Sequence, residues 1–513
     1  MKRNDGTVVL LLVLFTLAIR LGPALTREFL SPDACLYLDI GKNFWDGKGF
    51  IATHNFYQYF NTENYPAAAF MQPIFPILIG LFYKLAGSVI LTNLANTLIC
   101  CINVALIYYL LSSFSRLSRI FVCLIISANY SFFILSLFAL TEHLHLFFIL
   151  LSLFYFKRLA VSEGESAGLS VRLGLIMGVA SLVRAANLYL IAGYLLALVY
   201  MKRGSREIIR FTLCSTGVFL VYQAAIYLLT GRIFPEYFAA AKTFGQARLF
   251  GGYYAFNTPV LNTTFNPGFS GMLSLMRQTA APKLGNFLAM LNGYLGFFLW
   301  AFIPAWIYLM AKRGSREDKF FLSLAGIGIL NIAVLSVSVW WDPGLEIIRY
   351  ILVPYILLFI AGVYAMERLP GLKEGYKKVL LGSVFAVLFV MSSWESLDLS
   401  IYHVRSASAI RVEMAQRNRM LSWLKSNSVS SDYIATNEYD HAFPLDRPVV
   451  SLPEGKMLTP ENMGRFLKVF KPRLVWISNE AVPFYSVFLG GYGKKDLECG
   501  LRETYTVFVR NND

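Results

Sequence analysis

The sequence predicts a mainly α-helical, polytopic membrane bundle with a small soluble α/β domain at its C-terminal end. Of the 513 residues, 56% are hydrophobic and only 15% are charged, whereas a soluble protein has about 25% charged residues. The apolar residues form blocks of roughly 16 to 25, the length of a helix that crosses about 30 Å of hydrocarbon. After Trp394 the blocks stop, and short strand-like runs follow at Val449–Leu452, Leu474–Ile477 and Tyr505–Val509, which predict the soluble domain.

We expect about eleven membrane-spanning helices. The candidate spans are residues 7–25, 89–111, 119–137, 139–156, 171–185, 187–201, 208–230, 287–310, 320–340, 349–366 and 379–394. Each of the segments 119–156 and 171–201 is expected to hold two short helices, because an even number of crossings is needed there. Basic loops flank each pair, and two cytoplasmic loops must be separated by an even number of crossings.

Basic residues gather in the short loops between these blocks, for example at Lys157-Arg158, Lys202-Arg203 and Lys312-Arg313. This is the pattern of cytoplasmic loops, so the net charge of +15 reflects membrane topology and does not indicate a nucleic-acid partner. With the N-terminus in the cytoplasm and about eleven crossings, the C-terminal tail lies outside. We therefore expect a multi-pass protein of a bacterial or archaeal cytoplasmic membrane.

We divide the chain into a transmembrane domain, residues 1–394, and an extracytoplasmic α/β domain, residues 395–513. Two long outer segments belong to the transmembrane domain. In the first, residues 26–88, the apolar residues between Tyr37 and Trp45 predict an amphipathic helix that lies along the interface. The second, residues 231–286, is rich in Tyr, Phe, Gly and Asn and is longer than a connector needs, which predicts a lid or a binding surface.

Several charged residues fall at the outer ends of spans. Asp33 follows the first span directly, and an acidic residue near lipid is costly unless it has a task. Glu142 at the start of a span is costly for the same reason, which indicates that it faces a cavity or a partner. Arg349 suits a phosphate group because a guanidinium binds phosphate oxygens in pairs. Arg184, in the turn between two short spans, suits either a phosphate or an ion pair with Glu142.

Each of these residues also has a structural explanation. Asp33 follows Ser31-Pro32 and would serve as a helix N-cap, and Arg349 and Arg20 would extend to the headgroups. Asp39 is expected to be solvated or capping, and is the reserve carboxylate. The sequence assigns no metal ligands and leaves metal dependence open, since Asp33 with Asp39 or Glu142 would hold a divalent ion only if the fold brought them together.

Short motifs in a fixed order lie along residues 1–370. They are Pro32-Asp33-x-x-x-Tyr37-x-x-x-Gly41, Gly47-x-Gly49-Phe50, Pro73-x-x-Pro76, Thr141-Glu142, Gly178–Arg184 and Arg349–Pro354. Their order and topology resemble the GT-C membrane glycosyltransferases, especially the branch of protein O-mannosyltransferases and lipid A aminoarabinose transferases. One departure is that Gln72-Pro73 stands where the aminoarabinose branch has Lys-Pro-Pro, so the phosphate-binding role of that lysine does not carry over.

The resemblance implies that Asp33 is the catalytic acidic residue and that the donor is a sugar on a polyprenyl-phosphate carrier. Tyr37, Tyr350, Glu142 and Asp39 are then the candidate cavity and substrate residues. Chemistry points the same way, because no nucleotide sugar is available outside the membrane and the sequence has no phosphate-binding loop of the P-loop type. A base would take the proton of the acceptor and a cation would stabilise the departing phosphate.

The sequence therefore predicts an inverting glycosyltransferase, hexosyl or pentosyl, in which Asp33 is the base and Arg349 and Arg184 bind the donor phosphate. The acceptor is a lipid, a glycan such as lipopolysaccharide, or a protein of the cell envelope. A transporter or flippase of lipid-linked glycan is the first alternative, disfavoured because the acidic residues cluster at span ends. An O-antigen ligase or polymerase is the second, kept open by Arg232, Arg248 and Arg277 in the segment 231–286. A non-catalytic scaffold is the third.

Overall fold

The structure is a computed structural model that places most of the chain. It describes residues 3–26, 31–55, 67–68, 72–230, 268–296, 298–311, 314–337, 347–369, 374–438, 442–443, 445–453, 458–495, 497 and 504–511. All structural statements below concern these residues.

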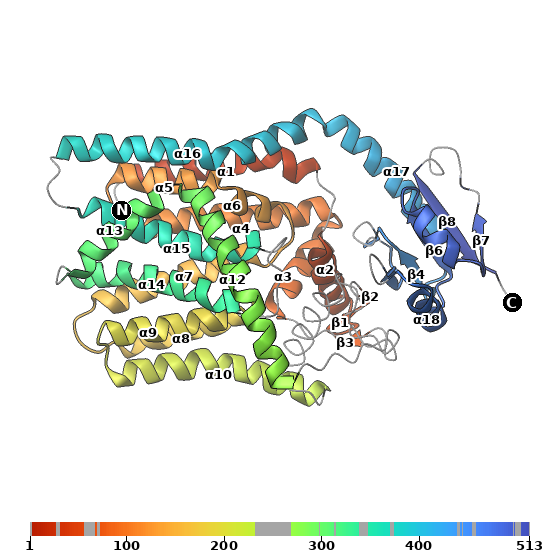
Figure 1. Cartoon of the computed structure of the whole chain (residues 1–513), viewed down its shortest axis with the longest axis horizontal. Helices are drawn as coiled ribbons and strands as arrows, with labels where there is room; N and C mark the ends of the chain where they lie inside the picture. Colours follow the sequence, from red (N-terminus) through yellow and green to blue (C-terminus); the bar gives the residue numbers. More distant parts are fainter. Residues whose placement is uncertain are drawn as a thin grey trace.

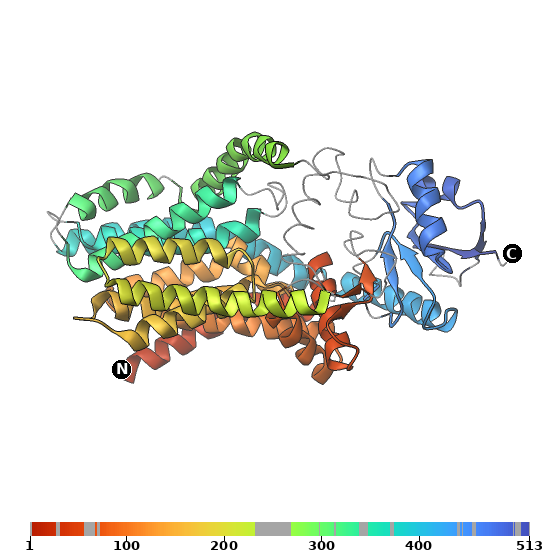
Figure 2. The same ribbon diagram turned by 90° about the horizontal axis from the view of Figure 1, so that it is seen from below.

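Apolar helices form a bundle whose axes run along the long dimension of the molecule, with the C-terminal sheet beyond one end of it (Figures 1 and 2). They are α1 (Arg3–Thr26), α4 (Val89–Leu110), α5 (Arg116–Ala128), α6 (Tyr130–Ile134), η3 (Leu135–Leu137), α7 (Glu142–Val161), α8 (Ala167–Ser181), α9 (Asn187–Tyr200), α10 (Ser205–Thr230), α12 (Gly268–Leu295), α13 (Phe298–Ala311), α14 (Arg316–Val337), α15 (Ile347–Glu367) and α16 (Glu374–Arg405). The predicted mainly helical membrane bundle is confirmed.

Seven of the described helices are long and apolar enough to cross a membrane, or eight if α5 and the segment Tyr130–Leu137 count as one bent span. The three other predicted spans coincide with shorter apolar helices, namely α8, α9 and α13. Their lengths of 14 or 15 residues fall below the roughly 17 residues of a perpendicular span. The chain is an integral, multi-pass membrane protein.

Two predicted helices are interrupted. The span 119–137 bends by 64° at Asn129, where the backbone is extended and the side chain accepts a hydrogen bond from the Phe132 amide. Such a local bond offers the backbone an alternative to the helix ladder. The span 287–310 is also not one helix, because α12 ends at Leu295 and Gly296 adopts a positive φ of 54°. In addition, α12 begins at Gly268, so residues 268–286 of the predicted outer segment are helical, and residues 231–267 lie outside the described part.

The expectation that Arg20 extends to the headgroups is wrong. Its side chain is fully buried inside the bundle. It donates hydrogen bonds to the Ser136 hydroxyl and to the carbonyls of Thr16 and Ser127. A buried guanidinium is tolerable only when its donors are satisfied in this way, so Arg20 joins α1 to the bent α5–α6 segment.

The first outer segment contains two helices, α2 (Pro32–Trp45) and α3 (Ile74–Ala86). Ser31 is the N-cap of α2, since its hydroxyl accepts a hydrogen bond from the Ala34 amide, so the N-cap interpretation of Asp33 is wrong. The two helices touch at Gly41 and Gly80, where a Cβ on Gly41 would lie 2.1 Å from the Pro76 carbonyl oxygen. Only glycine permits this close backbone approach, and it fixes the amphipathic helix α2 on α3.

The C-terminal part forms a six-stranded mixed sheet with the order β2-β5-β4-β6-β8-β7. Its strands are β4 (Ile434–Thr436), β5 (Val449–Ser451), β6 (Leu474–Ser478), β7 (Tyr492–Lys495) and β8 (Tyr505–Arg510), and β2 (His54–Asn55) comes from the first outer segment. β2, β5, β4 and β6 are mutually parallel, and β8 is antiparallel to β6 and β7. A two-residue ladder of β1 (Ile51–Ala52) with β3 (Ala67–Ala68) lies in the first outer segment.

Helices cover both faces of this sheet. Trp476 of β6 packs in one apolar cluster with Leu424 of α17 (Ala407–Ser426), whereas its neighbour Val475 packs on the other face with Phe466 of α18 (Pro460–Phe470). Side chains of a strand alternate between faces, and both faces of β6 are buried. The predicted small α/β unit is confirmed. α16 continues past residue 394 to Arg405 without a break.

Candidate functional site

Two carboxylates and two guanidinium groups meet where the first outer segment joins the helix bundle. Arg349 bridges the two acids: its Nη1 donates to Asp33 and its Nε donates to Glu142. Arg184 also contacts Glu142 through Nη1, and the same nitrogen lies 3.0 Å from the Thr141 hydroxyl. Four residues that the sequence separates by up to 316 positions thus form one cluster, which we call the carboxylate–arginine site.

Each side chain of the site is placed by the end of a helix. Asp33 lies in the first turn of α2, Glu142 opens α7, and Arg349 lies in the first turn of α15. Arg184 lies in the tight α8–α9 turn, where its amide bonds to the Ala180 carbonyl at 3.1 Å. Because these four positions lie at helix ends or in a turn between two helices, the four charged side chains converge at one end of the bundle.

The turn that carries Arg184 is held from two sides. The Ile74 amide of α3 donates to the Leu182 carbonyl at 3.3 Å. On the other side, the ring of His145 on α7 lies 3.2 Å from the Asn187 side-chain oxygen, and the Asn187 amide group donates to the Met177 carbonyl. These bonds fix Arg184 relative to both the first outer segment and Glu142.

The site is electrically balanced but unevenly exposed. Glu142 is 2% exposed and is matched by two arginines, whereas the Asp33 side chain is 30% exposed. The two carboxylates and the two guanidinium groups together carry no net charge. Charged groups next to hydrocarbon are tolerated when they are paired in this way. Asp33 is therefore the group of this set that incoming reactants reach most easily.

Two tyrosines flank the site. The guanidinium of Arg184 lies over the ring of Tyr350, 4.7 Å from its centre, a cation–π arrangement. Tyr37, one turn after Asp33 on α2, packs edge to face on Phe75. Burial raises the pKa of Tyr37, and the charge of Asp33 raises it further, so its hydroxyl stays protonated and acts as a neutral hydrogen-bond donor or acceptor.

Asp39 is not part of the carboxylate–arginine site. Its oxygens accept hydrogen bonds from the amide and Nδ1 of His54, both at 2.9 Å, from Asn43 at 3.2 Å, and from Thr53. Burial alone would raise the pKa of Asp39, but the neighbouring His54 and these hydrogen bonds hold it below its usual value. The expectation that Asp39 is solvated or a helix cap is wrong, because it is buried in the middle of α2. It fastens α2 to the segment that contributes β2 to the C-terminal sheet.

Sequence reasoning missed His54 as the partner of Asp39, because a lone histidine in an irregular segment carries no pattern. Further contacts tie the same region to the C-terminal domain: Lys42 lies 2.7 Å from Asp446, and Tyr83 packs edge to face on Phe443. Within the described residues, no group of three or more His, Cys, Asp or Glu side chains is arranged to hold a metal ion. Asp33 and Glu142 are instead brought together by an arginine.

No protein-family model matches the sequence, and no curated protein is significantly similar to it. Solved structures do match. ArnT from Cupriavidus metallidurans bound to undecaprenyl phosphate is 14% identical, with a TM-score of 0.60 over 98% of this chain and 97% of that one. The oligosaccharyltransferase AglB from Archaeoglobus fulgidus, in complex with an inhibitory peptide and a dolichol-phosphate, is 13% identical, with a TM-score of 0.55 over 96% of this chain and 73% of that one.

The arabinofuranosyltransferase AftD from Mycobacteria is 13% identical, with a TM-score of 0.53; the match covers all of this chain and 40% of that one. At such low identity the likeness establishes the fold. The fold is similar to that of ArnT along almost the whole length of both chains. The resemblance seen in the sequence motifs is thereby confirmed at the level of the fold.

Proposed function

We propose that this protein is a membrane glycosyltransferase that transfers a sugar from a polyprenyl-phosphate donor to an acceptor on the non-cytoplasmic side. The observation that carries the proposal is the bridge of Arg349 between Asp33 and Glu142 at one end of the bundle. Structures of the same fold were obtained with undecaprenyl phosphate and with a dolichol-phosphate. A polyprenyl phosphate brings a hydrophobic tail and an anionic head, which suits a cationic site at the end of membrane helices.

In the proposed reaction Asp33 is the base. It accepts the proton of an acceptor hydroxyl while that oxygen attacks the anomeric carbon of the sugar. The bond between this carbon and the phosphate oxygen breaks, and polyprenyl phosphate departs with the electron pair. A single displacement of this kind inverts the anomeric configuration, and a positioned base contributes about 10²–10⁴-fold in rate.

Arg349 and Arg184 are proposed to stabilise the departing phosphate. In the free protein Arg349 is shared between Asp33 and Glu142, so a donor phosphate competes with Asp33 for its Nη1. Once the phosphate takes that position, Asp33 is free to face the acceptor. Glu142 is the buried anchor that keeps both arginines in place, because it contacts each of them.

The proposed location and domain roles follow from placing the reaction at the carboxylate–arginine site. We place catalysis in residues 1–394, with the site facing outward from a bacterial or archaeal cytoplasmic membrane. Residues 395–513 then form an extracytoplasmic domain that supports the first outer segment through β2. The acceptor is proposed to be a lipid, a glycan or a protein. No metal ion is required by this mechanism, since guanidinium groups supply the positive charge.

The alternatives fit the site less well. A flippase of lipid-linked glycan needs charges along a path at mid-membrane, whereas Asp33, Glu142 and Arg349 lie at helix ends. The alternative of an O-antigen ligase or polymerase rests on arginines of the second outer segment. Of these, Arg277 is exposed on α12, and Arg232 and Arg248 lie outside the described residues.

The substitution Asp33→Asn tests the proposal, with Asp46→Asn as the matched control at the other end of α2. Asp46 is an exposed carboxylate that pairs with Lys84. The assay is transfer of labelled sugar from a synthetic polyprenyl-phosphate donor by purified protein in nanodiscs. Asp33→Asn is expected to lower the rate at least a hundredfold, within the usual range for loss of a base, and Asp46→Asn to leave it unchanged. Near-normal transfer by folded Asp33→Asn protein would remove Asp33 as the base.

A further inference from the structure

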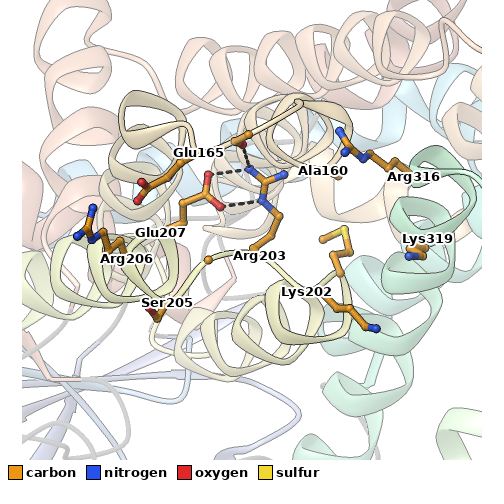
Figure 3. A pocket seen from close by; sticks show the side chains of 12 residues that line it. Ala160, Glu165, Lys202, Arg203, Ser205, Arg206, Glu207, Arg316 and Lys319 are labelled. Atoms are coloured by element: carbon orange, nitrogen blue, oxygen red, sulfur yellow. Dashed lines mark hydrogen bonds and ion pairs between the residues drawn. The ribbon is translucent and has the colours of Figure 1, made fainter.

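Figure 3 shows a polar cavity, which lies at the end of the bundle opposite to the carboxylate–arginine site. It has a volume of about 500 Å³ and opens between the α7–α8 turn, the α9–α10 turn and the start of α14. The two sites are separated by the length of α7, from Glu142 to Val161, which is roughly 30 Å at 1.5 Å per residue. The cavity is therefore spatially separate from the carboxylate–arginine site.

The cavity is lined by more positive charges than negative ones. Its charged lining residues are Lys202, Arg203, Arg206, Arg316, Lys319, Glu165 and Glu207. The acids are already matched: Glu207 is buried and pairs with Arg203 at 2.7 Å, and Glu165 pairs with Arg210 at 3.1 Å. Among the described residues, no carboxylate pairs with the four other lining cations, so the cavity carries an uncompensated positive charge.

The walls of the cavity are held together by hydrogen bonds to one turn. Arg203 donates to the Ser162 and Gly164 carbonyls at 3.1 and 2.7 Å, and Arg316 donates to the same Ser162 carbonyl at 2.7 Å. Glu207 accepts from the Ser166 amide at 2.7 Å. Lys202 adopts a positive φ of 57°, a conformation that costs energy for a residue with a side chain and occurs preferentially at functional sites. These hydrogen bonds therefore fix the turns that carry the cationic side chains.

We propose that this cavity binds a phosphate group, carried either by an anionic membrane lipid or by a soluble ion. Guanidinium and ammonium groups both bind phosphate oxygens, and the cavity lining supplies both kinds of group. The volume lies within the range of small-ligand sites, about 300–1,000 Å³. The cavity opens at the ends of α10 and α14, which both qualify as membrane spans, so it lies at the level where lipid headgroups approach. Clusters of Lys and Arg next to membrane spans attract anionic headgroups.

The test removes one cation from each wall, in the full-length double variant Lys202→Gln/Lys319→Gln. Both side chains line the cavity. Neither takes part in the hydrogen bonds that hold the turns together, so these bonds are retained in the variant. The matched control, Arg158→Gln/Arg172→Gln, removes two exposed charges from α7 and α8 outside the cavity lining. Arg203 and Arg316 are left intact because they hold the turns together.

Two arms distinguish the source of the phosphate. In the first, the thermal midpoint of protein in neutral detergent is followed as inorganic phosphate replaces chloride at constant ionic strength. In the second, native mass spectrometry counts lipids retained from vesicles of phosphatidylglycerol or of phosphatidylcholine. Binding in the first arm identifies a soluble phosphate, and selective retention of phosphatidylglycerol identifies a lipid headgroup.

In whichever arm binding occurs, the double variant is expected to bind roughly 25-fold more weakly, at about fivefold for each surface charge, and the control is expected to bind as the wild type does. Equal binding by wild type and double variant would overturn the proposal. So would equal losses in the double variant and the control, since the effect would then come from overall charge. The single variant Lys319→Gln, with about a fivefold loss expected, serves if the double variant does not fold.

Discussion

Replacing Arg349 by lysine separates the two contacts that this residue makes. Arg349 reaches Glu142 through Nε and Asp33 through Nη1, and the shorter reach of a single ammonium allows it to keep only one of them. Glu142 is 2% exposed and Asp33 is 30% exposed, so lysine is expected to stay with the buried acid. The contact that is lost is therefore the more exposed one, to Asp33.

The expected magnitude follows from the hydrogen bond that Nη1 is proposed to donate to the departing phosphate in place of Asp33. A hydrogen bond to a charged group is worth about 1.5–3 kcal/mol, and the 30% exposure of Asp33 at this position favours the lower value. Since about 1.4 kcal/mol corresponds to a factor of ten, Arg349→Lys is expected to reduce kcat/KM for the polyprenyl-phosphate donor about tenfold. Because this bond stabilises the phosphate as it departs, the loss appears in kcat and not only in KM.

The assay is steady-state sugar transfer by purified protein in nanodiscs, with the thermal midpoint measured in parallel to show that the variant is folded. Arg210→Lys is the matched control, because Arg210 makes a single, exposed ion pair with Glu165. The reasoning would be refuted if Arg349→Lys retained kcat/KM within twofold of the wild type, or if Arg210→Lys lost as much activity.

Two further predictions concern the first outer segment. Because the pKa of Asp39 is lowered in the folded protein by His54 and its hydrogen bonds, its stabilising effect is present above the unfolded value near 3.9 and disappears as the pH falls through the folded value. Thermal midpoints measured between pH 6 and pH 3 should therefore fall more steeply for the wild type than for Asp39→Asn, and parallel curves would contradict this. Gly41→Ala places a Cβ 2.1 Å from the Pro76 carbonyl oxygen and should destabilise the fold by about 1–3 kcal/mol, whereas Gly217→Ala, which has open space around it, should be neutral or stabilising by up to about 1 kcal/mol. Equal denaturation midpoints for the two glycine variants would show that the contact between α2 and α3 is not tight.

The sequence was sufficient to find the charged residues of the site but not their arrangement. Hydropathy places Glu142 and Arg349 at the ends of spans, where an ionisable residue is costly and therefore conspicuous. The bridge from Arg349 to Asp33 and Glu142 spans 316 and 207 positions of sequence, and no local pattern encodes such a pairing. The spacing of Asp33 and Gly41 was visible as a motif, but its physical reason, the backbone contact with α3, needs the folded structure.

In the C-terminal sheet too, the sequence predicts some strands but not the way in which a distant segment pairs with them. The strand-like runs at Val449–Leu452, Leu474–Ile477 and Tyr505–Val509 correspond to β5, β6 and β8, because buried strands are rich in β-branched and aromatic residues. The strand β2 has only two residues, His54 and Asn55, which is too short for any periodicity to reveal. Its pairing with β5 across almost 400 positions ties the C-terminal sheet to the segment that carries Asp33.

The bend at Asn129 and the break at Gly296 were also beyond the reach of hydropathy. Both lie within continuously apolar stretches, and a window average registers apolar content without registering backbone geometry. A single side-chain hydrogen bond at Asn129 and a single positive φ at Gly296 redirect the chain. Local backbone chemistry therefore decides the path of helices that composition can only place in the membrane.

The most direct test of the proposed function is the fate of a labelled donor. Membranes containing this protein or its Asp33→Asn variant at equal abundance are incubated with a radiolabelled polyprenyl-phosphate sugar, and the labelled cellular component is separated from the carrier. The wild type should move the label to an acceptor and release polyprenyl phosphate in equal amount, whereas the variant should leave the label on the carrier. Label that crosses the membrane while still attached to its carrier, or equal transfer by both proteins, would contradict the assignment.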